Sequence, residues 1–252
     1  MRQKLILTRR LYGFPQGVNE PIWLFEKDAE LKAHPRYQEA KAGVVEAAVE
    51  LVSELAYNFL ASIMDKLPTD AIYIAPHARE ATGDNAIPQV LATAAAIVAQ
   101  GTVETDIVQV TRVYHTGADP MERMCLRPEF EGVVIKGARY VLVDDVTSMG
   151  GTLAELANYL QYYGGTVVAV IVFVNAGRVK QFRPTRKVIN ELEKRYAYEI
   201  EEIFGIVTNA LTANEANYLI GFKSADEIRN RLVKARKETN LRLRSKGIEC
   251  QI

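Results

Sequence analysis

The stretch VLVDDVTSMGGT, residues 141–152, constrains the fold of this chain more than any other part of its sequence. An apolar run ends in two adjacent acids, Asp144 and Asp145, and a loop that contains Gly150 and Gly151 follows at once. A solvent-exposed turn requires neither paired like charges nor two successive glycines. The stretch therefore predicts a strand, a loop and a helix that serve one ligand together.

The middle of the chain alternates between strand and helix patterns. Strands are predicted at residues 71–75, 106–114, 140–143 and 166–174, and helices at residues 37–66, 87–99 and 151–163. This alternation predicts an α/β fold, a mainly parallel Rossmann-like sheet flanked by helices. The run VVAVIVFV, residues 167–174, is apolar throughout, which is typical of a central strand buried on both faces.

The patterns divide the chain into three parts: an N-terminal segment (1–36), the α/β core (37–180) and a helical C-terminal extension (181–252). Beyond Asn175 only helices are predicted, at residues 184–202, 213–220 and 224–241. The sequence Thr-Ala-Asn-Glu, residues 212–215, is typical of a helix start. Trp23 and Phe25 are interpreted as a buried anchor of the N-terminal segment, with a docking strand or a lid over the site as alternatives.

Composition places the chain among globular proteins that work in water. It has 252 residues, 48% hydrophobic and 25% charged, and a formal net charge of zero. Cys125 and Cys250 form no spaced motif, so neither a disulfide framework nor a zinc site is indicated. Thr8, Arg9 and Arg10 interrupt the first apolar run, unlike a signal peptide, and no apolar stretch approaches the roughly 20 residues of a membrane span. We expect a cytoplasmic protein without a membrane partner.

The loop after the two acids has the properties of an anion site. Backbone N–H groups of residues 149–152 would point at an anion from the start of a helix, and the hydroxyls of Ser148 and Thr152 would add donors. Two carboxylates beside such a loop suit a ligand that carries hydroxyls or a divalent metal, and ribose and Mg²⁺ both qualify. Acidic pairs also end strands in phospho-receiver domains, but the mid-chain position and the small-residue turn argue against that class.

The stretch resembles the 5-phosphoribosyl-1-pyrophosphate (PRPP) binding motif of type I phosphoribosyltransferases, in which two acids and two small or apolar residues precede Thr-Thr-Gly-x-Thr. The resemblance implies that Asp144 and Asp145 face the ribose hydroxyls, act in catalysis and hold Mg²⁺. It also implies that the 5-phosphate is bound by the loop residues, namely Thr147, Ser148, Met149, Gly150, Gly151 and Thr152. Met149 departs from the family's usual Thr, so one hydroxyl donor is lost.

Two further segments fit the order that the resemblance implies. IAPHARE, residues 74–80, follows a strand where the family binds pyrophosphate, so His77 and Arg79 are candidates, with a turn-capping role as the alternative for His77. Residues 112–132 occupy the place of the family's mobile loop, with Arg112, Arg123 and Arg127 as candidate cationic closers and Arg123 assigned to catalysis. Within the family, spacing and loop style look most like ComF-type proteins over about residues 70–178, without their zinc-ribbon cysteines.

The resemblance implies an enzyme that transfers phosphoribosyl from PRPP to an acceptor and releases pyrophosphate. Purine-salvage members place an acid inside the phosphate loop as a general base, but Ser148 stands there in this chain, and the acceptor is not identified. The sequence leaves open whether turnover occurs.

The alternative function is a regulatory protein that senses PRPP or a nucleotide and contacts nucleic acid through its tail. Residues 221–252 carry nine Lys and Arg against four Asp and Glu, including Arg229, Arg231, Lys234, Arg236 and Lys237 on one predicted helix. The same helix could instead dock on the acidic body or on a second copy of the chain in a homodimer.

Overall fold

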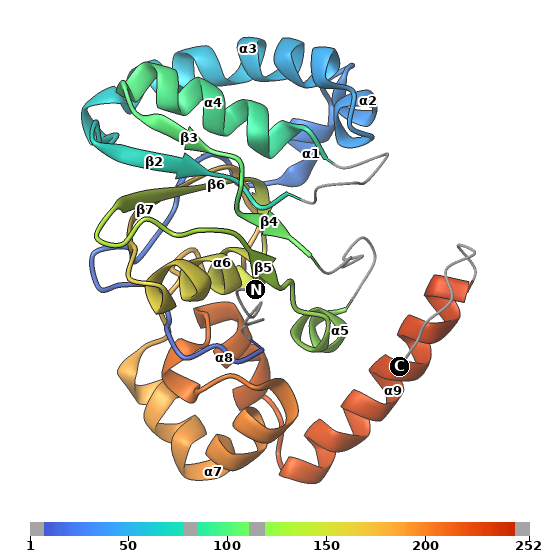
Figure 1. Cartoon of the computed structure of the whole chain (residues 1–252). Helices are drawn as coiled ribbons and strands as arrows, with labels where there is room; N and C mark the ends of the chain where they lie inside the picture. The colour runs from blue at the N-terminus through green and yellow to red at the C-terminus, as the bar shows by residue number, and fades with distance from the viewer. Residues whose placement is uncertain (1–7, 78–84, 111–118, 245–252) are drawn as a thin grey trace, which may run out of the picture.

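The computed structural model describes residues 8–77, 85–110 and 119–244, with side chains as far as residue 241. At its centre lies a five-stranded parallel sheet with the strand order β1-β7-β6-β2-β3 (Figure 1). The strands are β1 (Ile22–Phe25), β2 (Ala71–Ile74), β3 (Thr102–Glu104), β6 (Arg139–Thr147) and β7 (Thr166–Asn175). The predicted α/β fold with a parallel sheet is confirmed.

The two central strands position the candidate site. β7 is buried on both faces, as predicted, because helices cover the sheet above and below (Figure 1). β6 continues past its predicted end through both aspartates, and its register with β7 runs as far as the pair Thr147 and Asn175. The acid pair therefore lies inside the hydrogen-bonded strand rather than in the loop.

The N-terminal segment contributes a strand to this sheet. β1 pairs in parallel with β7, with Ile22 opposite Ile171 and Phe25 opposite Val174. Trp23 packs against the core on the α6 side of the sheet, and Phe25 packs against the core on the other side. A docking strand is thus the observed role of this segment, and the boundary at residue 36 stays a prediction.

Two predicted elements differ from the observed ones. Of the strand predicted at 106–114, residues 111–114 lie outside the described part, and the described part contains β4 (Val108–Gln109), which pairs in antiparallel fashion with β5 (Phe130–Glu131) outside the main sheet. The sheet is completed instead by β3, which begins directly after α4 and pairs with β2. The helix predicted at 37–66 is broken because Gly43 adopts a φ of +96°, which cannot continue a helix.

Helices form a layer on each face of the sheet. One layer comprises α1 (Asp28–Lys32), α2 (Tyr37–Lys41), α3 (Val45–Ser62), η1 (Met64–Lys66) and α4 (Ile87–Ala99), and α6 (Gly151–Tyr162) covers the other face (Figure 1). The first layer packs against β6 through Val141 and Val143, and α6 packs against Leu142 of the same strand. Alternate residues of β6 therefore face different layers, as strand geometry requires.

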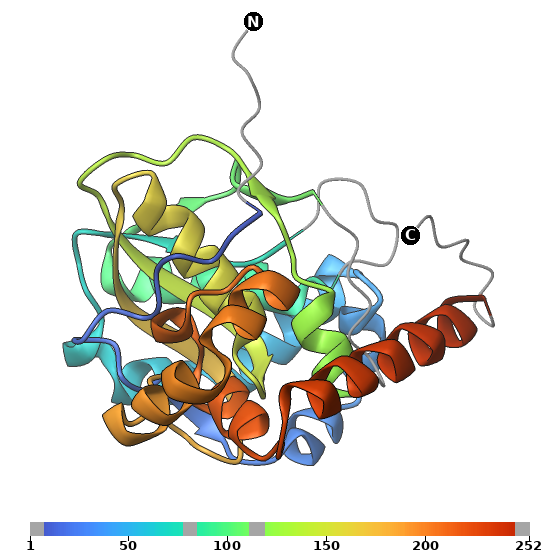
Figure 2. The same cartoon turned by 90° about the horizontal axis from the view of Figure 1, so that it is seen from below.

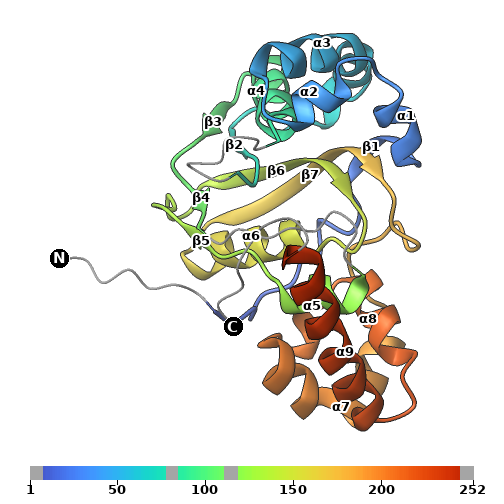
Figure 3. The same ribbon diagram turned by 90° about the vertical axis from the view of Figure 1, so that its right-hand side faces the viewer.

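The C-terminal extension is helical, as predicted, and forms a third hydrophobic cluster below α6 (Figure 3). It comprises α7 (Arg186–Phe204), η2 (Thr208–Ala210), α8 (Ala213–Ile220) and α9 (Ala225–Arg244), together with α5 (Pro120–Cys125) from the middle of the chain. Figure 2 shows α9 running past α5 and away from the rest of the molecule. In the described ranges, no helix has the length and apolar character needed to cross a membrane.

Candidate active site

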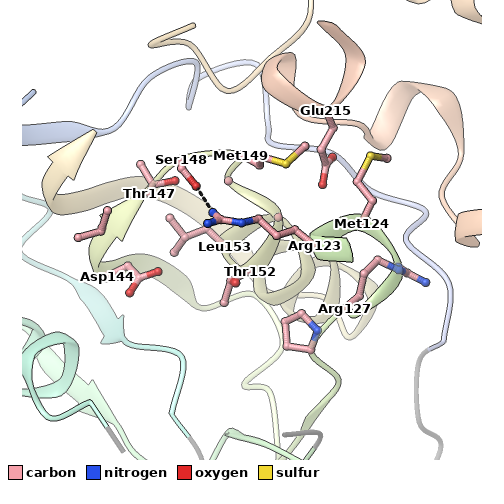
Figure 4. A pocket seen from close by; sticks show the side chains of 14 residues that line it. Arg123, Met124, Arg127, Asp144, Thr147, Ser148, Met149, Thr152, Leu153 and Glu215 are labelled. Carbon is pink, nitrogen blue, oxygen red and sulfur yellow. Dashed lines mark hydrogen bonds between the residues drawn. The ribbon is translucent and has the colours of Figure 1, made fainter. Parts of the chain in front are cut away.

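The loop between β6 and α6 borders a cavity of about 110 Å³ at the carboxyl end of the sheet. Gly150 is the N-cap of α6 and has a φ of +77°, a left-handed conformation that glycine adopts without strain. The first N–H groups of a helix have no intrahelical partner, so α6 presents donors and a partial positive charge to this cavity. The lining includes Asp144, Thr147, Ser148, Met149, Gly150, Gly151 and Thr152 of the predicted motif (Figure 4).

The two aspartates have different surroundings, because adjacent residues of a strand point to opposite faces of the sheet. Asp144 lines the cavity. Asp145 is buried and accepts a hydrogen bond at 2.7 Å from Nζ of Lys41, in α2 of the opposite helix layer. Its side chain also accepts a 2.8 Å bond from Nδ2 of Asn85. The structure thus brings Asp144, but not Asp145, into the lining of the cavity.

The surroundings of Asp144 disfavour the charged form of its side chain. Burial raises its pKa well above the ordinary value of 3.8, the neighbouring Asp145 raises the pKa further, and Lys41 only partly offsets both. A cation or hydroxyl donors from a ligand would stabilise its charged form. Among the described residues no cluster of three His, Cys, Asp or Glu side chains could hold a metal ion alone.

Arg123 reaches across the cavity from α5 (Figure 4). Its Nη1 donates to Oγ of Ser148 across 2.6 Å, which places the guanidinium beside the hydroxyl of the loop. Asp119 fixes the start of α5 through a capping box with Glu122. A guanidinium beside a helix N-terminus forms a strong anion site, and the structure thus brings Arg123 together with the predicted loop.

The predicted pyrophosphate residues are only partly described. His77 lies outside the cavity lining, and its two ring nitrogens are each 3.1 Å from a backbone carbonyl, that of Ala75 and that of Thr105. The ring thereby connects the segment after β2 to the segment after β3, which favours the turn-capping role that was the alternative for His77. Arg79 and Arg112 lie outside the described residues, and their roles stay predictions.

Met149 explains the departure from the family motif in structural terms. Its side chain is partly buried against the hydrophobic cluster of the C-terminal helices. Its carbonyl accepts a 2.6 Å hydrogen bond from Oγ1 of Thr212, the N-cap of α8. The loop is therefore attached to the C-terminal extension both by an apolar contact and by a hydrogen bond.

Sequence reasoning missed several charged residues around the cavity. Arg10, fully buried, pairs with Glu155 of α6 and with Glu215 of α8, and Glu215 lines the cavity. Arg127, which the sequence did predict as a cationic residue of this region, lines the cavity too and donates to Glu155 at 2.8 Å. In the sequence, Arg10 could have been noticed as an arginine within an apolar segment. Glu215 could have been noticed as the partner of Thr212 in a capping box, which the structure confirms.

The loop lies within a region of the chain that matches a known protein family. Residues 84–205 match the family model described as the phosphoribosyl transferase domain. By this match, residues 84–205 form a phosphoribosyl transferase domain. This domain includes the acid pair, the glycine loop and α6 and extends through α7 of the helical extension.

Curated relatives exist, but they are longer than this chain. Protein TraN of Escherichia coli is 36% identical over 214 residues, which cover 82% of this chain and 48% of TraN. An uncharacterized protein of Haemophilus influenzae is 36% identical over 136 residues, 53% of this chain and 30% of that protein. The chain thus spans less than half the length of these two relatives. An adenine phosphoribosyltransferase structure from Leishmania donovani aligns over 77% of this chain and 87% of its own, with 15% identity and a TM-score of 0.35.

Proposed function

We propose that the phosphoribosyltransferase domain binds PRPP with Mg²⁺ and transfers the phosphoribosyl group to an acceptor, with release of pyrophosphate. One observation carries this proposal: a carboxylate, a loop hydroxyl, an arginine and a helix N-terminus meet in one cavity. Ribose hydroxyls suit the carboxylate of Asp144, and a terminal phosphate suits the loop at residues 148–152.

In this reaction the bond between C1 of the ribose and the diphosphate oxygen breaks, and a bond from C1 to the acceptor forms. The protein's contribution is orientation and electrostatic stabilisation. The loop and the start of α6 would hold the 5-phosphate, Asp144 would orient the ribose, and Arg123 would supply positive charge over the cavity. Mg²⁺, when bound, would neutralise charge on the diphosphate, with Asp144 as a protein ligand.

The acceptor has a candidate location beside this cavity. A second cavity of about 530 Å³ shares Arg123, Ser148 and Met149 with the first, so the two adjoin. Its other walls come from the segment after β7, including Arg178, and from α8, including Tyr218. We propose that the acceptor enters here, between the core and the C-terminal extension.

The regulatory alternative has less support from the described part of α9. Arg229 pairs with Glu199 and Asp226, and Arg231 pairs with Asp119 and Glu238. Lys234 lies 3.8 Å from Glu238, so these three basic side chains already have acidic partners. Contact with nucleic acid, a homodimer, a cytoplasmic location and the narrower likeness to ComF-type proteins stay predictions.

Calorimetric titration with PRPP and Mg²⁺ tests the proposal. Wild type should bind, and Asp144→Asn should weaken binding at least about tenfold, the effect of losing a charged hydrogen-bond acceptor. Asp70→Asn is the matched control, because Asp70 is an exposed acid paired with Arg139 at the other end of the strands. Pyrophosphate release would then be assayed with candidate acceptors. The proposal would be overturned if folded wild type bound neither PRPP nor ribose 5-phosphate.

A further inference from the structure

A buried arginine lies at the junction of three segments beside the phosphate loop. Arg10 comes from the N-terminal segment, and its side chain has no exposed surface. Its Nε donates to Oε1 of Glu155 across 2.8 Å, and its Nη1 and Nη2 donate to the two carboxylate oxygens of Glu215 across 2.8 and 2.9 Å. Its Nη1 also reaches the carbonyl of Ala210 at 3.3 Å.

One of these two carboxylates belongs to the cavity wall. Glu215 lines the cavity and projects toward it from α8 (Figure 4). A Cβ placed on Gly151 would lie only 3.2 Å from its Oε1, so the carboxylate sits against the first residue of α6. A negative group at this place would repel an anion held by the same helix terminus.

Arg10 supplies half of the positive charge that faces Glu155 and Glu215 in the buried cluster. Glu155 and Glu215 are opposed by Arg10 and Arg127, and Arg127 bonds only to Glu155 among these carboxylates. Among the described residues, Arg123 and Asp144 line the same cavity as Glu215, and Cys125 and Glu129 line a small neighbouring cavity together with Glu155. Burial lowers the pKa of Arg10, but Glu215 and Glu155 outweigh it and the pKa is raised, so Arg10 remains charged.

We propose that Arg10 is a positioning residue for phosphate binding: it neutralises and fixes Glu215, so that the start of α6 accepts an anion. This inference rests on the proposed function, because it assigns the phosphate to the loop at residues 148–152. Arg10 does not line the cavity and acts through Glu215. The N-terminal segment is thereby a functional part of the site as well as the source of an edge strand.

The test compares the affinity for ribose 5-phosphate in wild type and in Arg10→Met, by calorimetry from about pH 8 to about pH 5.5. In the variant Glu215 lacks its arginine, and an unpaired buried carboxylate takes up a proton at a higher pH than usual. We expect the variant to bind on the order of tenfold more weakly than wild type at the upper pH and nearly as well at the lower pH. The affinity of the variant is divided by that of wild type at each pH, so that the titration of the ligand's own phosphate cancels. Inorganic sulfate serves as a second probe, because its charge does not change over this pH range.

A rescue variant separates the charge effect from a loss of structure. Arg10→Met combined with Glu215→Gln removes both charges, so affinity should return toward wild type and its ratio to wild type should no longer depend on pH. Glu215→Gln alone covers the case in which Arg10→Met fails to fold, because Gln keeps an oxygen for the capping hydrogen bond from the Thr212 N–H. This variant should bind ribose 5-phosphate severalfold more tightly, since it leaves Arg10 in excess.

The outcomes distinguish this inference from the proposed function. If wild type binds neither ribose 5-phosphate nor PRPP, the proposed function is wrong. If wild type binds, but Arg10→Met loses affinity equally at every pH and the double variant is not rescued, Arg10 has only a structural role. Unchanged affinity in folded Arg10→Met, or in Glu215→Gln, would likewise overturn the inference.

Discussion

Lys41 and Asp145 form an ion pair across 2.7 Å that connects α2 to the carboxyl-terminal part of β6. Burial lowers the pKa of the Lys41 ammonium, but the Asp145 carboxylate outweighs this effect and the pKa is raised. Asp145 is buried, whereas the Lys41 side chain is 38% exposed, so solvent screens the pair in part. The pair gives one of two adjacent acids a fixed cation and leaves the other facing the cavity.

Replacing Lys41 with Met should destabilise the fold by about 1–3 kcal/mol, because it leaves the Asp145 carboxylate buried without its cation. The measurement is urea unfolding at neutral pH. A group whose pKa is raised on folding contributes stability fully below its unfolded pKa, here 10.5, and loses it as the pH rises through the folded pKa. The difference from wild type should therefore stay constant through neutral pH and shrink only in strong alkali.

The matched control is Lys32→Met, which removes the exposed pair between Lys32 and Asp28 on neighbouring α1. Exposed pairs contribute little, so this change should stay within about 0.5 kcal/mol of wild type. Equal effects of the two substitutions would contradict the assignment of the buried pair.

Asp144→Asn should raise stability at neutral pH while it weakens PRPP binding. The folded-state pKa of Asp144 is raised by burial first and by Asp145 second, so its ionisation opposes folding. The cost is absent below the unfolded pKa of 3.8 and grows as the pH rises toward the folded pKa. Thermal unfolding of both proteins over a pH series checks this sign; a variant less stable than wild type at neutral pH would refute it.

Met149→Thr should trade stability for phosphate affinity. The variant restores the family's hydroxyl, and one added hydrogen bond would tighten ribose 5-phosphate binding about fivefold. It also removes an apolar contact with the C-terminal cluster, so unfolding free energy should fall by about 1–2 kcal/mol. Calorimetry and urea unfolding measure the two effects. Met64→Thr, at a residue 53% exposed, is the control and should change neither property.

Arg231→Met should weaken ligand binding from a distance. Arg231 of α9 pairs with Asp119, the N-cap of the short helix that carries Arg123, and Thr239 donates at 2.6 Å to Glu122 of the same helix. Loosening α5 would misplace the guanidinium, and we expect affinity for ribose 5-phosphate to fall about threefold to tenfold. Arg229→Met, which removes pairs with Glu199 and Asp226 only, should bind like wild type. Parallel losses in both variants would show that α5 is not the cause.

The sequence by itself determined the strand–loop–helix unit of the site and the type of sheet. Residues 141–152 predicted the anion loop because glycine, hydroxyl and acid positions are adjacent in the chain, and local geometry follows from local sequence. The apolar run of β7 predicted a central strand for the same reason. The patterns misled at 106–114, which reads as a strand although residues 102–104 pair with β2, and at 37–66, where Gly43 breaks the predicted helix.

Only the tertiary structure decided which charged groups meet. In the sequence Arg10 is 145 positions from Glu155 and 205 positions from Glu215, and no sequence period brings these residues together. The separation of Asp144 from Asp145 likewise depends on β6 continuing as a strand through both residues and on α2 lying over one face. Such pairings arise because packing the helix layers onto the sheet sets the distances between charges, and burial then decides which of them need a partner.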